Sequence, residues 1–220
     1  KKTKPLDQKT LKMKTRKMQH AIRKKFGGDY AADERTFIMG IDHRFTAHFA
    51  KRFRDFNVLE TCTGAGFTTI SLAKTAKHVF TVEIDKLIQE QAIKNIEKAG
   101  LLSQVSFIYG NILDQILLDS FLSIDAAFID PDWATTGLDH IYRFINSKTK
   151  PPADIVLKKI LEITKNVAIV LPPFINTEEF NSLPRHECEK LYLGKNHELF
   201  CLYFGKLIKS FGETRFCLAT

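Results

Sequence analysis

Apolar residues along the chain gather in short runs that alternate with longer stretches of helical spacing. The short runs, each bounded by polar or turn residues, predict buried strands over 56–60, 78–83, 104–110, 124–130 and 166–172. Stretches in which apolar residues recur every three or four positions predict helices over 43–54, 66–76, 86–99 and 153–165. Asp42 is placed to cap the first of these helices, and Gly100 to end the third.

Strands that alternate with helices are typical of an α/β fold with a mostly parallel sheet and right-handed crossovers. The tail departs from this alternation, since residues 186–193 and 197–206 read as two strands around a turn of Gly194, Lys195 and Asn196. We therefore expect a Rossmann-like, mostly parallel sheet with an antiparallel C-terminal hairpin and a small N-terminal helical extension. The length of 220 residues suits one such domain.

Positive charge is concentrated at the start of the chain. Residues 1–25 contain eleven Lys or Arg residues and one acid, Asp7, whereas the rest of the chain is slightly acidic. Such a block is typical of an arm that contacts phosphates, and equally of a solubilising helix or tail. With a Gly-containing loop at 26–35, the chain divides into a basic arm (1–25), a helical extension (26–54) and an α/β domain (55–220).

The composition argues against a membrane span and against a metal site. No apolar run approaches the ~20 residues that a spanning helix needs. None of the four cysteines forms a CxxC pair, and no His/Cys spacing matches a zinc site, so no metal is expected. We expect reduced thiols and a cytoplasmic location, with a nuclear location, reached through the basic arm, as the alternative.

The sharpest motif is the turn ETCTGAGFTT, residues 60–69, between the first α/β strand and its helix. Gly64 and Gly66 let the backbone turn tightly and approach a ligand closely. The helix that follows offers free N–H groups to a carboxylate or phosphate. A dinucleotide is the alternative ligand. The sequence motif of dinucleotide-binding turns, however, has a third small residue at the position of Thr69.

Two side chains farther along predict a nucleoside at this turn. Glu83 closes the second strand, where a carboxylate can accept hydrogen bonds from two ribose hydroxyls. Asn111 follows the third strand, where its amide can reach an adenine edge, although a simple turn residue is an equal reading. The expected cofactor site comprises Glu60, Cys62, Thr63, Gly64, Gly66, Glu83, Ile84, Asn111 and Ile112.

A second motif, Asp130-Pro131-Asp132-Trp133, follows the fourth strand at the carboxyl edge of the sheet. It is similar to the (Asp/Asn/Ser)-Pro-Pro-aromatic loop of enzymes that methylate amines. The lone pair of an exocyclic amine is delocalised into its ring, so an acceptor must take its hydrogens and orient the nitrogen. Asp130 would be that acceptor, Pro131 would fix the loop and Trp133 would stack on the base. We include Asp132 in the candidate catalytic set.

These pieces, in this order, resemble the trimethylguanosine synthase family, the RNA cap guanine-N2 methyltransferases. The resemblance covers about residues 26–208. It is carried by an FGGDY-like segment from Phe26, F-x-x-G-x-D from Phe37 to Asp42, ETCTGAGFTT, TVEID at 81–85, D-P-x-W at 130–133, ITKNVAIVLPP at 163–173 and LYFGKLI at 202–208.

The resemblance implies a class I methyltransferase fold, S-adenosyl-L-methionine (SAM) as cofactor and RNA as substrate. The methyl group would go to the exocyclic N2 amine of a guanosine, in that family part of a 7-methylguanosine cap. In the family, an acid at the position of Glu60 supports the loop and the amino-acid part of SAM. Trp133 falls where the base-stacking tryptophan lies, and a Trp face attracts a cationic N7-methylguanine more strongly than neutral guanine.

The chain departs from the family's usual Pro-Pro-Trp, because Asp132 stands in place of the second proline. The glycine pair that often follows the tryptophan is replaced by Ala134-Thr135-Thr136-Gly137. Asp132 can attract a cationic base, accept a proton or repel a phosphate. Two alternatives stay open: methylation of another amine, such as adenine N6, and a non-catalytic protein that binds SAM and RNA.

Overall fold

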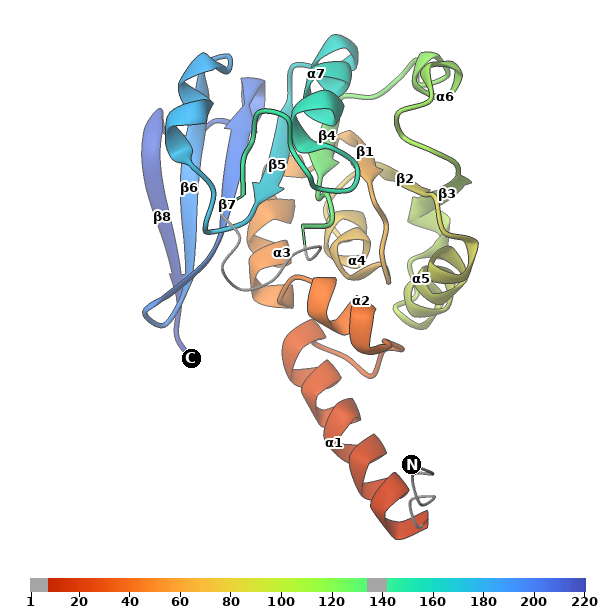
Figure 1. The fold of residues 1–220 in the computed structure, drawn as a ribbon. Coiled ribbons are helices and arrows are strands. Elements are labelled where there is room, and N and C mark those ends of the chain that lie inside the picture. Colours follow the sequence, from red (N-terminus) through yellow and green to blue (C-terminus); the bar gives the residue numbers. More distant parts are fainter. Residues whose placement is uncertain (1–7, 134–141) are drawn as a thin grey trace, which may run out of the picture.

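The computed structural model describes residues 8–133 and 142–220, with side chains described from residue 15 onward. An eight-stranded sheet in the order β3-β2-β1-β4-β5-β7-β6-β8 forms the centre of this part of the chain (Figure 1). The strands are β1 (Asn57–Thr61), β2 (His78–Glu83), β3 (Val105–Tyr109), β4 (Ala126–Ile129), β5 (Val167–Leu171), β6 (His186–Leu193), β7 (Asn196–Phe204) and β8 (Gly212–Leu218).

Helices cover both faces of this sheet. The helices of the described chain, of which the first extends away from the sheet, are α1 (Gln8–Phe26), α2 (Glu34–Met39), α3 (His43–Ala50), α4 (Phe67–Ala73), α5 (Lys86–Lys98), α6 (Gln115–Asp119) and α7 (Ala153–Ile163). Short 3-10 turns are η1 (Lys51–Phe53), η2 (Leu102–Gln104), η3 (Thr177–Ser182) and η4 (Gly205–Leu207).

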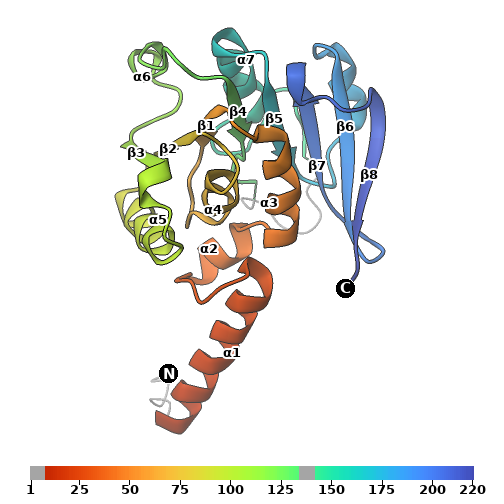
Figure 2. The same cartoon turned by 180° about the vertical axis from the view of Figure 1, so that it is seen from behind.

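Residues of the central strands alternate between two apolar cores, as the period of a strand dictates. Val58 and Phe128 face one core, which they share with residues of α3, α4 and α5. Leu59 and Ile129 face the other core, which they share with residues of α6 and α7. The central strands are apolar on both faces because helices cover both, as the two opposite views show (Figures 1 and 2).

The predicted α/β fold with an antiparallel C-terminal hairpin is confirmed. Strands β1 to β5 pair in parallel, β7 runs antiparallel to β5, and β6 and β7 form the hairpin around Gly194, whose φ is +60°. Asp42 caps α3 through a hydrogen bond from the Arg44 N–H, as predicted. The helix predicted over 43–54 is α3 followed by η1.

Several elements differ from the prediction. α4 ends at Ala73 rather than at 76, and α7 at Ile163 rather than at 165. Two short helices, α2 and α6, and strand β8 were not predicted. The predicted loop at 26–35 runs instead into α2, which begins at residue 34.

Helix α1 projects away from the sheet and meets the domain only near its end (Figures 1 and 2). Ile22 and Phe26 are buried there with Ala65 and Phe67. The rings of Phe26 and Phe67 stack, with centroids 3.5 Å apart and planes at 6°. The proposed boundary at residue 25 thus falls within the last turn of this helix, and the division into three segments stays a prediction.

A buried ion-pair network joins η1 to the C-terminal strands. The Arg52 guanidinium donates to both oxygens of Glu187 at 2.6 and 3.0 Å and to Glu189 at 3.3 Å. It also lies 3.6 Å from the ring centroid of Tyr203 on β7. Glu187 accepts a further hydrogen bond from Thr214 on β8 at 2.8 Å. Arg52 therefore ties β6 and β7 to the helical layer, and Glu187 extends the network to β8.

Candidate functional site

The motifs from the sequence meet where the parallel strands end. Glu60 of β1 lies beside Thr81 of β2 and Phe128 of β4, so the residues that follow these strands share one edge of the sheet. Because β2 and β4 flank β1 on opposite sides, the strand order reverses at this point. Such a reversal opens a crevice at the carboxyl ends of parallel strands, where α/β proteins bind ligands.

The turn after β1 adopts a left-handed backbone at three residues. The φ angles of Cys62, Gly64 and Gly66 are 63°, 56° and 86°. A Cβ on Gly66 would come within 3.2 Å of the Ile96 side chain, so close packing against α5 favours glycine there. A Cβ on Gly64 would meet no atom within 4 Å. The backbone at Gly64 therefore faces open space without an intervening side chain.

Glu60 stabilises this turn through buried hydrogen bonds. Its buried carboxylate accepts hydrogen bonds from Thr69 of α4 at 2.5 Å and Thr81 of β2 at 2.7 Å. The Thr81 hydroxyl also lies 2.6 Å from the hydroxyl of Thr63, another predicted cofactor residue. Burial raises the pKa of Glu60 to about 8, against the lowering effect of these hydrogen bonds.

Glu83, at the end of β2, is hydrogen-bonded to backbone on both carboxylate oxygens. One oxygen accepts from the N–H of Gly64 at 3.0 Å, and the other from the N–H groups of Ile84 and Asp85, each at 3.0 Å. Burial nevertheless raises the pKa of this carboxyl. Since each carboxylate oxygen can accept two hydrogen bonds, the oxygen that faces Gly64 retains capacity for a ligand.

Asn95 of α5 is a supporting residue that the sequence did not reveal. Its buried side-chain amide donates to the carbonyl oxygens of Ala31 and Ala65, at 2.8 and 2.9 Å, and its oxygen accepts from the Ala31 N–H at 2.8 Å. Asn95 thereby links the helical extension to the glycine turn. A polar residue on the apolar side of the predicted helix 86–99 was the available signal.

The remaining predicted cofactor residues have different environments. Asn111 is exposed, and its side-chain oxygen accepts a hydrogen bond from the N–H of Leu113 at 2.9 Å. This contact is that of a simple turn residue, the alternative role that the sequence left open for Asn111. The side chain of Ile112 is buried in the core shared with Leu59 and Val82 and so is not exposed to a ligand. Ile84 is 63% exposed beside Glu83. It offers an apolar surface at the mouth of the crevice.

Asp130 directly follows β4 and is half-buried, while Pro131 after it is buried. Burial and, secondarily, the negative charge of Asp132 raise the pKa of Asp130 to about 7. Asp132 and Lys150 exchange two backbone hydrogen bonds, at 2.9 and 2.8 Å, which fix the loop. A carboxyl that ionises near neutral pH on a fixed loop can accept hydrogens from a bound amine.

Trp133 is half-buried and packs partly against the core below the sheet edge. Its carbonyl accepts a hydrogen bond from the Tyr142 hydroxyl, and the two rings meet edge to face with centroids 6.1 Å apart. Residues 134–137, where the family's glycine pair is replaced, lie outside the described residues. The indole is thus oriented by Tyr142 next to the Asp130 loop.

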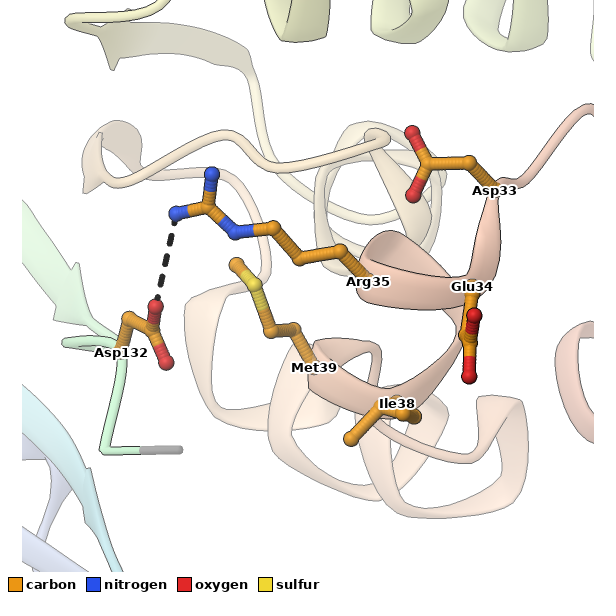
Figure 3. A pocket seen from close by; sticks show the side chains of 6 residues that line it. All are labelled: Asp33, Glu34, Arg35, Ile38, Met39 and Asp132. Carbon is orange, nitrogen blue, oxygen red and sulfur yellow. Dashed lines mark ion pairs between the residues drawn. The ribbon is translucent and has the colours of Figure 1, made fainter. Parts of the chain in front are cut away.

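A pocket of about 550 Å³ opens between α2 and this loop (Figure 3). Arg35 reaches across it toward Asp132, with 3.6 Å between guanidinium nitrogen and carboxylate oxygen. The pocket is lined by Asp33, Glu34, Arg35, Ile38, Met39 and Asp132. None of the α2 residues was among the predicted site residues. The signal was the capping box of Asp33 and Thr36, which starts the helix.

No group of three His, Cys, Asp or Glu side chains able to hold a metal ion occurs among residues 15–133 and 142–220. Within the described chain, no helix combines the length and apolar character that crossing a membrane requires.

Comparison with known proteins identifies the relatives of this arrangement. The family model described as RNA cap guanine-N2 methyltransferase matches residues 56–205, from the start of the sheet to the end of β7. The catechol O-methyltransferase of Niastella koreensis is 38% identical over 82 residues, which are 34% of this chain and 37% of that protein. The aligned part of this relative is therefore little more than a third of its length.

Solved structures share the fold at low sequence identity. A candidate methyltransferase from Porphyromonas gingivalis W83 superposes with a TM-score of 0.69 at 15% identity, over 89% of this chain and 49% of that chain. The chain thus spans about half of that protein. The O-methyltransferase TomG from Streptomyces achromogenes, in complex with SAM, gives a TM-score of 0.53 at 16% identity, over 86% and 87% of the two chains. These likenesses show a class I methyltransferase fold.

Proposed function

The chain belongs to the RNA cap guanine-N2 methyltransferase family, and from this premise we propose that it transfers a methyl group from SAM to the exocyclic N2 amine of a guanosine in RNA. One observation carries the proposal. The glycine turn, Glu83 and the loop of Asp130 and Trp133 lie at the carboxyl ends of neighbouring strands, at one edge of the sheet.

The residues around the glycine turn fit SAM. The open space at Gly64 lets a ligand approach the backbone, and Glu83, fixed by three backbone N–H groups, retains an acceptor for a ribose hydroxyl. Ile84 would contact the adenine, and Asn111 and the backbone of Ile112 would border its edge. When bound, SAM supplies an electrophilic methyl group. Glu60 accepts hydrogen bonds from Thr69 and Thr81, so it fixes the turn even without a ligand.

The loop after β4 would bind the guanine. Asp130 and the neighbouring backbone carbonyl of Pro131 accept the two N2 hydrogens and direct the nitrogen lone pair out of the ring, while Trp133 stacks on the base. Methyl transfer to N2, which breaks the sulfur–methyl bond of SAM, requires N2 to lose one proton, and the Asp130 carboxylate would be the acceptor near it. Catalysis then consists mainly of positioning two bound groups.

Charge at the pocket favours a cationic base. Among the described residues that line the pocket, three are acids (Asp33, Glu34 and Asp132) and one is a cation (Arg35). An N7-methylated guanine carries a positive charge, which these acids and the face of Trp133 attract. We therefore include a 7-methylguanosine as the preferred form of the substrate.

The basic helix α1 would contact the RNA backbone. Among its described side chains, Arg16, Lys17, Arg23 and Lys24 are exposed, and helix α1 contains no acidic residue. Arg23 is paired with Asp29 at 2.7 Å, whereas Arg16, Lys17 and Lys24 on the same projecting helix are suited to phosphate contacts.

Incubation of the protein with methyl-labelled SAM and RNA, followed by nucleoside analysis, tests the proposal. RNAs that carry a 7-methylguanosine cap, an unmethylated guanosine cap or no cap are compared, with Asp130→Asn as the control variant. We expect label in N2-methylated guanosine, greatest with the 7-methylguanosine cap and reduced at least tenfold in Asp130→Asn. Label only in N6-methyladenosine or in protein would contradict the guanine assignment. SAM binding in calorimetry without transfer would support the binding-protein alternative.

A further inference from the structure

We infer that Arg35 of α2 is a positioning residue for the methyl-transfer site, because it neutralises Asp132 and so keeps the neighbouring Asp130 available as an ionised acceptor. The inference rests on the proposed function, which assigns Asp130 to the substrate amine. It names a residue outside the strands and loops that carry the family motifs.

The geometry brings the two charges together from separate elements. Asp132 is held by its backbone exchange with Lys150, and its side chain is only 15% exposed. Arg35 projects from the first turn of α2, with a side chain 63% exposed, and its guanidinium extends toward Asp132 (Figure 3). The distance of 3.6 Å is that of an ion pair rather than of a hydrogen bond.

Helix α2 is itself fixed, so Arg35 is presented from a stable base. The capping box of Asp33 and Thr36 closes its first turn. The ammonium of Lys25, from α1, donates to the carbonyl oxygen of Phe37 at 2.6 Å. The N-terminus of the short helix is therefore capped, and its middle is held by α1.

The charge environment of Asp130 explains why a cation is needed. The negative charge of Asp132, two residues away, disfavours ionisation of Asp130. Glu60 of β1 and Cys62 of the turn also interact with Asp130, but the raised pKa values of both groups keep them protonated at neutral pH. Among the described residues, Asp132 is thus the charged group beside Asp130 that Arg35 can oppose.

The family resemblance gives this pair a second rationale. Where the second residue after the acceptor is proline, the loop carries no charge at that position and requires no cation on α2. Here Asp132 introduces a charge, and Arg35 lies opposite it. The two residues therefore form a compensating pair, and removal of the acid should make the arginine dispensable.

Four variants test this inference: Arg35→Met, Arg35→Lys, Asp132→Asn and the double variant Arg35→Met/Asp132→Asn. Asparagine keeps the backbone N–H that Asp132 donates to Lys150, and Arg54→Met removes an exposed arginine elsewhere. Thermal unfolding confirms that each variant folds. The readout is kcat/KM for RNA against pH, together with the titration of Asp130 by NMR of 13C-labelled aspartates, assigned with Asp130→Asn.

In Arg35→Met we expect the acid limb of the profile and the Asp130 titration to move up by roughly 0.3–0.7 pH unit, since exposed ion pairs are weak. Below the midpoint this is about a two- to fivefold loss of rate. Arg35→Lys should retain the wild-type profile, and Arg54→Met should not change it. Asp132→Asn should move both readouts down, and the double variant should match Asp132→Asn.

Two results would overturn the inference: an Asp130 titration unchanged in Arg35→Met, or a double variant shifted as far upward as Arg35→Met. Failure of the proposed function is a separate result, in which the wild-type protein transfers no methyl group to guanosine. The NMR titration needs no substrate, so it decides the electrostatic claim in that case as well.

Discussion

Glu60 and Asp130 are two of the carboxyl groups at this site whose pKa values are raised, yet their surroundings give them different roles. Glu60 is closed off by the hydroxyls of Thr69 and Thr81, which link β1, α4 and β2. Asp130 is half-buried on the loop at the sheet edge. A carboxyl that is enclosed and hydrogen-bonded supports structure, whereas one that borders a pocket and titrates near pH 7 can take part in chemistry.

Glu60→Gln should change how stability depends on pH. The pKa of Glu60 rises from 4.5 in the unfolded chain to about 8 in the fold, so the folded state binds the proton more tightly. The contribution of Glu60 to the free energy of unfolding should therefore be fully present below the unfolded value and fall as pH rises toward the folded value, by roughly 1 kcal/mol per pH unit. Urea denaturation at several pH values measures the slope. The free energy of unfolding of Glu60→Gln should depend less on pH, with a remaining slope from Asp130. Equal slopes in the variant and the wild type would refute this explanation.

Trp133→Ala should weaken base binding by about 1–3 kcal/mol, the range for stacking of a base on an aromatic side chain. Fluorescence or calorimetric titration with 7-methylguanosine and guanosine nucleotides measures the loss. The loss should be larger for the cationic base. Tyr142→Phe, which keeps the edge-to-face ring, is the control for general disturbance of the loop, and an equal loss in both variants would argue against stacking.

At the scale of elements, the strands that carry the site were predictable because they are apolar on both faces. Runs such as 166–172 have few competing interpretations when helices cover both sides of a sheet. β8 escaped prediction because it lies at the sheet edge and mixes exposed charges such as Glu213 and Arg215 with apolar residues. α2 escaped because six residues are too short to show a helical period.

The same limits apply to the site. The positions of the glycine turn, Glu83 and Asp130 could be predicted because each lies at the carboxyl end of a strand in a recognisable motif. Asn95 and Arg35 could not, because their roles depend on which turn of a helix faces the strand ends. Such contacts between distant segments leave no local pattern in the sequence.

The buried network at Arg52 makes an element-scale prediction about stability. Arg52→Ala would leave Glu187 and Glu189 buried without their guanidinium partner, and breaking one side of a buried pair costs about 3–5 kcal/mol. Urea denaturation should show this loss as a lower midpoint. The exposed neighbour Lys51→Ala should change the free energy of unfolding by less than about 0.5 kcal/mol. A loss below about 1 kcal/mol in Arg52→Ala would show that the network is not structural.

At the scale of the whole molecule, charge and fold are divided between different parts. The sheet and its helices carry the motifs, while the excess positive charge lies in residues 1–25, most of which form the projecting helix α1. A substrate longer than one nucleoside can therefore touch the molecule at two places. Its base would occupy the pocket beside α2, and its phosphates would lie along the basic helix.

Replacing Lys17 and Lys24 of α1 by glutamine should weaken RNA binding and flatten its dependence on salt. Each lost phosphate contact should reduce the slope of log K against log salt by about 0.7 for single strands. Filter binding or fluorescence anisotropy at several salt concentrations measures the slope. Replacing Lys74 and Lys77, two exposed lysines after α4, is the matched control. Equal slopes in both variants would favour a solubilising role for the helix.

The stacking of Phe26 on Phe67 joins this helix to the residue next to Gly66, and so has a consequence for cooperativity. If RNA restrains the helix, the adjacent turn loses freedom that cofactor binding would otherwise have to remove. Thermodynamic linkage then requires RNA and S-adenosylhomocysteine to strengthen each other's binding by the same factor. In Phe26→Ala that factor should fall toward one in calorimetric titrations, while each ligand alone still binds.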